Sequence, residues 1–167
     1  AVDVPFEEDC LRMPGVLRNW TRYIGHLLET RASPALTRCV FDRAVSAIPY
    51  SHKLWKLFME WSPTTDQPEV VLSVMQRAVT ELPRFPRVWL RYAETCVRYK
   101  RAELGMWVLD HSLRNLPITQ HERIWDYYRV HFCGDLLFNE PDGGKEWIVD
   151  IWHRWLQLHP NKRDLEY

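Results

Sequence analysis

The segment PYSHKLW, residues 49–55, holds the proline and the tryptophan whose recurrence decides the fold. The same two residues stand six positions apart in PGVLRNW (14–20) and in PRFPRVW (83–89). A fourth copy, PITQHERIW (117–125), is two residues longer. Self-similarity at a fixed period of a few tens of residues is typical of a repeat protein.

The prolines that follow apolar-periodic runs set the length of the period. Their intervals are 35, 34, 34 and 43 residues, for Pro14, Pro49, Pro83, Pro117 and Pro160. A second landmark stands six and five residues before each proline after the first: Arg43-Ala44, Arg77-Ala78, His111-Ser112 and Arg154-Trp155. Because the three landmarks share one period of about 34 residues, the sequence predicts a row of equivalent units.

Each unit is predicted to hold two helices. The first helix of the first unit carries apolar residues at i, i+3, i+4, i+7 and i+8, which form one face. They are Trp20, Tyr23, Ile24, Leu27 and Leu28. The second helix starts at an N-cap, Ser33, followed by proline, and it stops at Pro49, which cannot continue a helix. Thr119 and Asp66, each with Glu three residues on, predict capping boxes for later helices.

The expected fold is an all-α solenoid of antiparallel helix pairs, in which the bulky aromatic residues of one helix pack on small residues of the other. A unit cannot bury its own apolar face, so neighbouring units must stack. The chain is expected to be a single array and a fragment of a longer solenoid. Its predicted parts are a half-unit (1–15), four repeats (16–50, 51–84, 85–118 and 119–161) and the start of another unit (162–167).

The residues expected to carry the repeat packing are those at the landmark positions. They are Trp20, Tyr23, Arg43, Ala44, Pro49, Trp55, Arg77, Ala78, Pro83, Trp89, Tyr92, Pro117, Trp125, Tyr128 and Pro160. In the fourth repeat the Arg-Ala pair is lost, since Trp155 stands in place of alanine, and a different packing surface is predicted there. The additional residues of this repeat fall mainly in a predicted loop, 133–144. Three further tryptophans lie outside the pattern and are candidates for exposure: Trp61, Trp107 and Trp147.

Composition excludes several classes of function. Lys plus Arg and Asp plus Glu number 22 each, so the net charge is zero and gives no overall attraction to nucleic acid or to an anionic membrane. No apolar run approaches the roughly 18 residues of a membrane span. The four cysteines form no CxxC pair, and His131, Cys133 and His153 are too few for a tetrahedral metal site. No phosphate-binding loop or nucleophile motif occurs, so we expect no enzyme, cofactor, metal or small-molecule substrate.

The combination of a Trp-x-x-Tyr first helix, an Arg-Ala second helix and a closing proline resembles the HAT repeat, a variant of the TPR found in RNA-processing proteins. The segments PFEED (5–9), YSHKLW (50–55) and NLPITQHERIW (115–125) are similar to the N-terminal repeats of Syf-type pre-mRNA splicing factors, the xeroderma-pigmentosum-group-A-binding protein family. This resemblance implies a nuclear, non-catalytic scaffold of the Nineteen-associated part of the spliceosome, with other splicing proteins as partners. Two alternatives remain: a repeat protein that contacts RNA, and a generic TPR-like peptide-binding module.

A positive charge stands two residues before each tryptophan of the repeat, at Arg18, Lys53, Arg87 and Arg123. A cation at the start of a helix is disfavoured by the helix dipole by about 0.3–1 kcal/mol. The recurrence of an unfavourable choice predicts an acidic counterpart. That counterpart is either an Asp or Glu of a neighbouring unit, or an acidic protein segment or RNA backbone of a partner. These four residues are the candidate partner-binding site.

Overall fold

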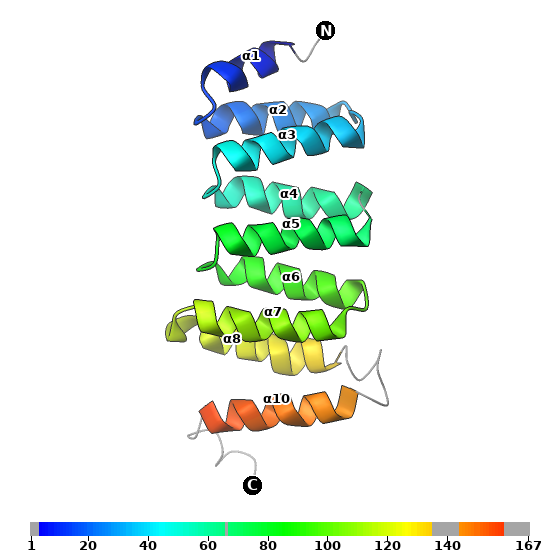
Figure 1. The fold of residues 1–167 in the computed structure, drawn as a ribbon, viewed down its shortest axis with the longest axis vertical. Helices are drawn as coiled ribbons and strands as arrows, with labels where there is room; N and C mark the ends of the chain where they lie inside the picture. The colour runs from blue at the N-terminus through cyan, green and yellow to red at the C-terminus, as the bar shows by residue number, and fades with distance from the viewer. Residues whose placement is uncertain (1–3, 66, 135–143, 159–167) are drawn as a thin grey trace. The chain divides into compact units, whose positions relative to one another are not determined.

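The computed structural model describes residues 4–65, 67–134 and 144–158, and the regular structure of these ranges is helical, without a strand (Figure 1). The all-α prediction is therefore confirmed. The chain divides into two compact units, residues 1–82 and 83–167.

The described residues of the first unit form five helices in chain order. They are α1 (Val4–Arg12), α2 (Leu17–Glu29), α3 (Pro34–Ala47), α4 (His52–Thr65) and α5 (Pro68–Glu81). Each helix packs on the next one along the chain, and the pairs α2–α3 and α4–α5 run antiparallel (Figure 1). These two pairs lie in the predicted repeats 16–50 and 51–84, and α1 lies in the predicted half-unit.

The second unit begins with the antiparallel pair α6 (Pro86–Arg98) and α7 (Ala102–Asn115). A single 3-10 turn, η1 (Ile118–Gln120), leads into α8 (His121–Asp126), which continues directly as a π-helical segment, η2 (Tyr127–Phe132). The last described helix, α10 (Gly144–Leu158), packs on η2. The fourth repeat therefore uses α8 and η2 as its first helix and α10 as its second. Of the predicted loop 133–144, Cys133, Gly134 and Gly144 are helical, and residues 135–143 lie outside the described ranges.

The helix starts agree with the sequence prediction at one of the three N-caps. The hydroxyl of Ser33 accepts a hydrogen bond from the backbone N–H of Leu36 at 3.3 Å. The capping box predicted at Asp66 lies outside the described residues, and α5 begins at Pro68, which is preset for the first helical turn. The capping box predicted at Thr119 is wrong. Thr119 lies inside η1, so that α8 begins only at His121.

The repeat residues meet in the core of each unit. Trp20, Trp55 and Trp89 are at most 4% exposed, and Ala44 of α3 and Ala78 of α5 are fully buried. The absence of a side chain beyond Cβ lets the helices of a pair approach closely. Leu28 was expected on the apolar face but is 40% exposed, because it lies at the margin of that face. Pro160 and the predicted segment 162–167 lie outside the described residues.

Candidate functional site

The proline and tryptophan of the repeat are joined by a hydrogen bond. The indole Nε1–H of Trp20 donates to the carbonyl O of Pro14 at 2.7 Å. The same bond joins Trp55 to Pro49 at 2.7 Å and Trp89 to Pro83 at 2.8 Å. A spacing of six residues brings the indole under the carbonyl that ends the preceding turn. The bond therefore ties the turn to the first helix of the following pair.

The arginine of the repeat lies against the same tryptophan. The guanidinium carbon of Arg43 is 5.5 Å from the ring centroid of Trp20, and that of Arg77 is 5.6 Å from the ring of Trp55. Each arginine also pairs with an acidic residue one period earlier in the chain. Arg43 bonds to Glu7 at 2.9 Å and Arg77 to Asp42 at 2.7 Å, across 36 and 35 residues. The arginine thus joins successive helix pairs, and it is not a free surface charge.

Sequence reasoning missed the acidic partners of these arginines, although their spacing was a usable signal. Asp42 stands directly before Arg43, and Asp110 directly before His111. Each of these acids lies about one repeat before the arginine with which it pairs, Asp42 before Arg77 and Asp110 before Arg154. An acid at this position therefore indicates an ion pair between successive repeats. Glu7 plays the same part from α1, and it also accepts a hydrogen bond from the Tyr23 hydroxyl at 2.9 Å.

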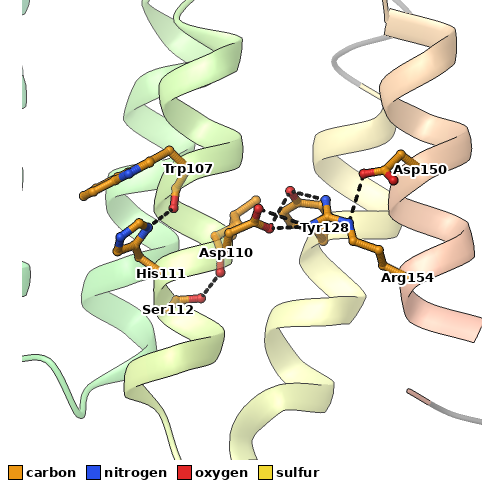
Figure 2. A network of polar contacts seen from close by, with 8 residues as sticks. Trp107, Asp110, His111, Ser112, Tyr128, Asp150 and Arg154 are labelled. Atoms are coloured by element: carbon orange, nitrogen blue, oxygen red, sulfur yellow. Dashed lines mark hydrogen bonds and ion pairs between the residues drawn. The ribbon is translucent and has the colours of Figure 1, made fainter. Parts of the chain in front are cut away.

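The fourth repeat keeps its arginine contact although the Arg-Ala pair is lost. Figure 2 shows Arg154 of α10 and Tyr128 of η2 converging on Asp110 of α7. Arg154 bonds to both carboxylate oxygens of Asp110 at 3.0 Å, and the hydroxyl of Tyr128 donates to Oδ1 at 3.1 Å. Asp150 adds a second ion pair to Arg154 at 3.0 Å. The pKa of Tyr128 is raised, mainly because the hydroxyl is buried and secondly because the negative charge of Asp110 lies close to it.

Trp155 and Trp125 show how the fourth repeat departs from the others. Trp155 is 3% exposed, and the guanidinium carbon of Arg129 lies 4.0 Å from its ring centroid. The bulky residue is therefore buried in a cation–π contact. Trp125 is buried, but in the described part of the chain its Nε1 has no hydrogen-bond partner. The two additional residues after Pro117 remove the spacing on which the proline–indole bond depends.

His111 and Ser112 occupy the Arg-Ala position of the third repeat. The imidazole of His111 stacks on Trp107 with centroids 3.8 Å apart, and its Nδ1 lies 3.0 Å from the Trp107 carbonyl O, to which an Nδ1–H would donate (Figure 2). Ser112 is fully buried and donates to the carbonyl of Leu109. Of the three tryptophans outside the pattern, Trp107 is 42% exposed, whereas Trp61 and Trp147 are half-buried.

The four candidate partner-binding residues are all exposed. Each lies in the first turn of a first helix: Arg18 in α2, Lys53 in α4, Arg87 in α6 and Arg123 in α8. The first turns of α2, α4 and α6 hold no acidic residue. Within the described ranges none of the four makes an ion pair, so an intramolecular acidic counterpart is not found there.

A groove of about 680 Å³ opens on the first unit between α1 and α3. Cys10 and Leu11 line one side, Arg38 and Cys39 the other, and Trp20 also contributes to its wall. In the described part of the chain, no cluster of three or more His, Cys, Asp or Glu is arranged to hold a metal ion. No helix of that part has the length and apolarity that crossing a bilayer requires.

A family model described as the pre-mRNA-splicing factor Syf1/CNRKL1 N-terminal HAT repeat matches residues 2–161. The chain belongs to this family. It is 38% identical to pre-mRNA-splicing factor syf1 of Neurospora crassa, over 95% of this chain and 19% of that protein. It is 31% identical to the Drosophila melanogaster syf1 homolog, over 95% of the chain and 18% of the relative. For Schizosaccharomyces pombe cwf3 the identity is 28%, covering 95% of the chain and 20% of that protein. This HAT-repeat chain thus spans about a fifth of the length of these relatives.

Proposed function

We propose that the chain is part of a nuclear, non-catalytic scaffold that holds other proteins of the spliceosome together during pre-mRNA splicing. The observation that carries this proposal is the match to the Syf1 N-terminal HAT repeats across residues 2–161. The relatives that share this region are named pre-mRNA-splicing factors. Membership of the Nineteen-associated complex rests on the same likeness.

The division of roles among the side chains supports a scaffold. The buried polar groups of the repeat, such as Tyr128 and the indoles of Trp20 and Trp55, form bonds within or between helix pairs. Stacked pairs present side chains at fixed intervals and allow partners to bind over an extended surface. We propose that Arg18, Lys53, Arg87 and Arg123 supply part of that surface.

Affinity capture from splicing-competent nuclear extract tests the scaffold, with the 167-residue chain as bait and a parallel sample treated with ribonuclease. We expect the same splicing proteins in both samples, since the contacts are made with protein. Loss of every partner after ribonuclease treatment would favour the alternative function, direct contact with RNA. Absence of splicing proteins from both samples would refute the scaffold.

We call these four cations, Arg18, Lys53, Arg87 and Arg123, the strip, and reversal of two of them tests it. Arg87→Glu combined with Arg123→Glu should weaken capture of splicing partners while leaving the melting curve nearly unchanged, because both side chains are exposed and lack an ion pair within the described residues. Arg98→Glu with Lys145→Glu changes the net charge equally at other exposed positions and is the matched control. Unfolding of the first variant would show that the strip has a structural role. Unchanged capture would show that the strip is solvated surface.

A further inference from the structure

Four exposed arginines gather at one end of the second unit. Arg84 and Arg87 flank the start of α6, Arg114 is in the last turn of α7, and Arg123 is in the first turn of α8. Because α6 and α7 are antiparallel and α8 follows α7 through a single turn, these helix ends lie on the same side of the unit (Figure 1). We call these four residues, with Phe85 and Ile118 between them, the arginine edge.

The backbone that carries the arginine edge is held by hydrogen bonds. The Trp89 indole donates to the carbonyl of Pro83 at 2.8 Å, which fixes the turn before α6. In the turn before α8, the Leu116 N–H donates to the carbonyl O of Ser112, and His121 Nε2 lies 2.9 Å from the Leu116 carbonyl O. A surface that is already ordered loses little entropy when a partner binds.

In the described part of the second unit, no acid is paired with the arginine edge. Four acids of this unit are paired elsewhere: Asp110 and Asp150 with Arg154, Asp126 with Arg129, and Glu94 with Arg91. Glu81 precedes Arg84 by three residues, and no ion pair joins the two in the described chain. Glu122 is half-buried and already engaged. Within the described residues no ion pair involves any of the four arginines. The surplus positive charge therefore faces solvent, and a carboxylate could be bound in bidentate geometry by each planar guanidinium.

Apolar side chains stand among these charges. Ile118 is 82% exposed and Phe85 44% exposed. Single-stranded RNA is held mainly by aromatic rings on which successive bases stack. The arginine edge exposes only one aromatic ring, that of Phe85, and one branched aliphatic side chain, that of Ile118, while the tryptophans of the repeat are buried. An aliphatic residue of a protein partner fits Ile118 better than a base does.

We propose that the arginine edge binds an acidic protein segment that carries at least one large aliphatic side chain. Carboxylates of the segment pair with Arg84, Arg87, Arg114 and Arg123, and its aliphatic residue packs on Ile118 and Phe85. The proposal rests on the scaffold function for its physiological setting and names the chemistry of one partner site.

The test measures binding of three labelled probes to the 167-residue chain by fluorescence anisotropy. The probes are a short Asp/Glu-rich peptide containing leucine, the same peptide with serine for leucine, and a single-stranded RNA of similar length. We expect the leucine peptide to bind best and to weaken as salt rises. Arg84→Glu with Arg114→Glu should raise its Kd at least about tenfold. Arg98→Glu with Lys145→Glu, exposed and remote from the edge, should not. Ile118→Ser should remove the preference for the leucine peptide over the serine peptide.

The outcomes separate this proposal from the scaffold function. Absence of saturable peptide binding, tighter binding of RNA that displaces the peptide, or an equal loss in the control variant would each overturn the arginine edge as an acidic-peptide site. If capture of splicing proteins persists in that case, the scaffold stands and uses another surface. Melting curves by circular dichroism establish that each variant is folded, and Arg84→Gln with Arg114→Gln replaces the reversal if it unfolds.

Discussion

The tryptophans at the start of the first three repeats have two functions in the packing, and a phenylalanine could fulfil only one. Their rings fill space in the buried core, and each Nε1–H satisfies a proline carbonyl that the end of the preceding helix leaves without an intrahelical partner. Trp125 retains the first function and lacks the second. Comparison of these positions therefore separates ring burial from hydrogen bonding.

Trp55→Phe should lower the free energy of unfolding by about 1 kcal/mol more than Trp125→Phe. The first change removes a 2.7 Å bond and leaves the Pro49 carbonyl without its donor, while the second removes an N–H that has no acceptor among the described residues. Trp55→Ala should cost about 3–5 kcal/mol through loss of the ring itself. Denaturant melts measure all three. Equal losses for the two phenylalanine variants would show that the proline–indole bond contributes no stability.

Asp110→Ala should cost about 1–3 kcal/mol, because it removes a carboxylate that binds both Arg154 and Tyr128 (Figure 2). Asp126→Ala is the matched control. Its side chain is 57% exposed and forms a short-range pair with Arg129, so its loss should cost at most about 0.5 kcal/mol. A double-mutant cycle between Asp110 and Arg154 isolates their coupling, and a coupling near zero would contradict the predicted clamp.

The cysteines should differ in reactivity and make stability fall in alkali. Cys39 is exposed, so alkylation followed by mass spectrometry should find it modified first. Burial raises the pKa of Cys96 to about 12 and that of Cys133 to about 11, from an ordinary 9.0. The unfolded chain releases these protons first, so their stabilising effect is complete below about pH 9 and is lost as pH rises toward 12. Cys96→Ala with Cys133→Ala should flatten the alkaline slope. An unchanged slope would assign it to other groups.

At the scale of the helices, Gly25 and Gly105 both lie inside helices but have opposite surroundings. A Cβ at Gly105 in α7 would lie 2.7 Å from Cε2 of the buried Phe132 ring, whereas a Cβ at Gly25 in α2 would meet nothing within 4 Å. Gly25→Ala should therefore stabilise by about 0.5–1 kcal/mol through helix propensity. Gly105→Ala should destabilise despite the same propensity gain, and Phe132→Leu should partly rescue it. If both alanines stabilise, α7 and η2 do not require close approach.

The fourth repeat shows how insertions change a helix without removing it. Its first helix passes from α8 into the π-helical η2, which carries the buried Tyr128 and Phe132. Two of its additional residues lie between Pro117 and Trp125, where η1 forms, and the others lie between Trp125 and Pro160. The landmarks that depend on side-chain position, Tyr128 and Arg154, are retained, whereas the landmark that depends on sequence spacing, the proline–indole bond, is lost.

For the whole molecule, the zero net charge and a sequence isoelectric point near 7.2 predict poor solubility close to neutral pH. Precipitation by polyethylene glycol at a series of pH values should show a minimum of solubility near pH 7. The variant Arg87→Glu with Arg123→Glu should move that minimum toward lower pH, because it replaces two positive charges with two negative ones and so lowers the net charge by about four units. A minimum that stays in place would mean that apolar contacts govern association.

The repeat pattern alone determined the fold class, the helix pairs and most of the core. Three landmarks with one period give this information because burial of an aromatic stripe at helical spacing leaves a chain little choice other than stacked helices. The pattern also placed Arg18, Lys53, Arg87 and Arg123 at the starts of first helices, where the structure has them. Local signals near helix starts were weaker, and the capping box at Thr119 failed because a 3-10 turn takes up the same residues.

Only the tertiary structure decided which charges are occupied and which are available. The sequence placed Arg43, Arg77 and Arg154 at a landmark of the repeat but did not show their partners. In the structure each lies against an aromatic ring and an acid from an earlier helix. Arg84, Arg87, Arg114 and Arg123 have no such partner in the described chain and form the arginine edge. The physical reason is that an ion pair depends on distance in space, and residues 35 to 44 positions apart meet only when helix pairs stack.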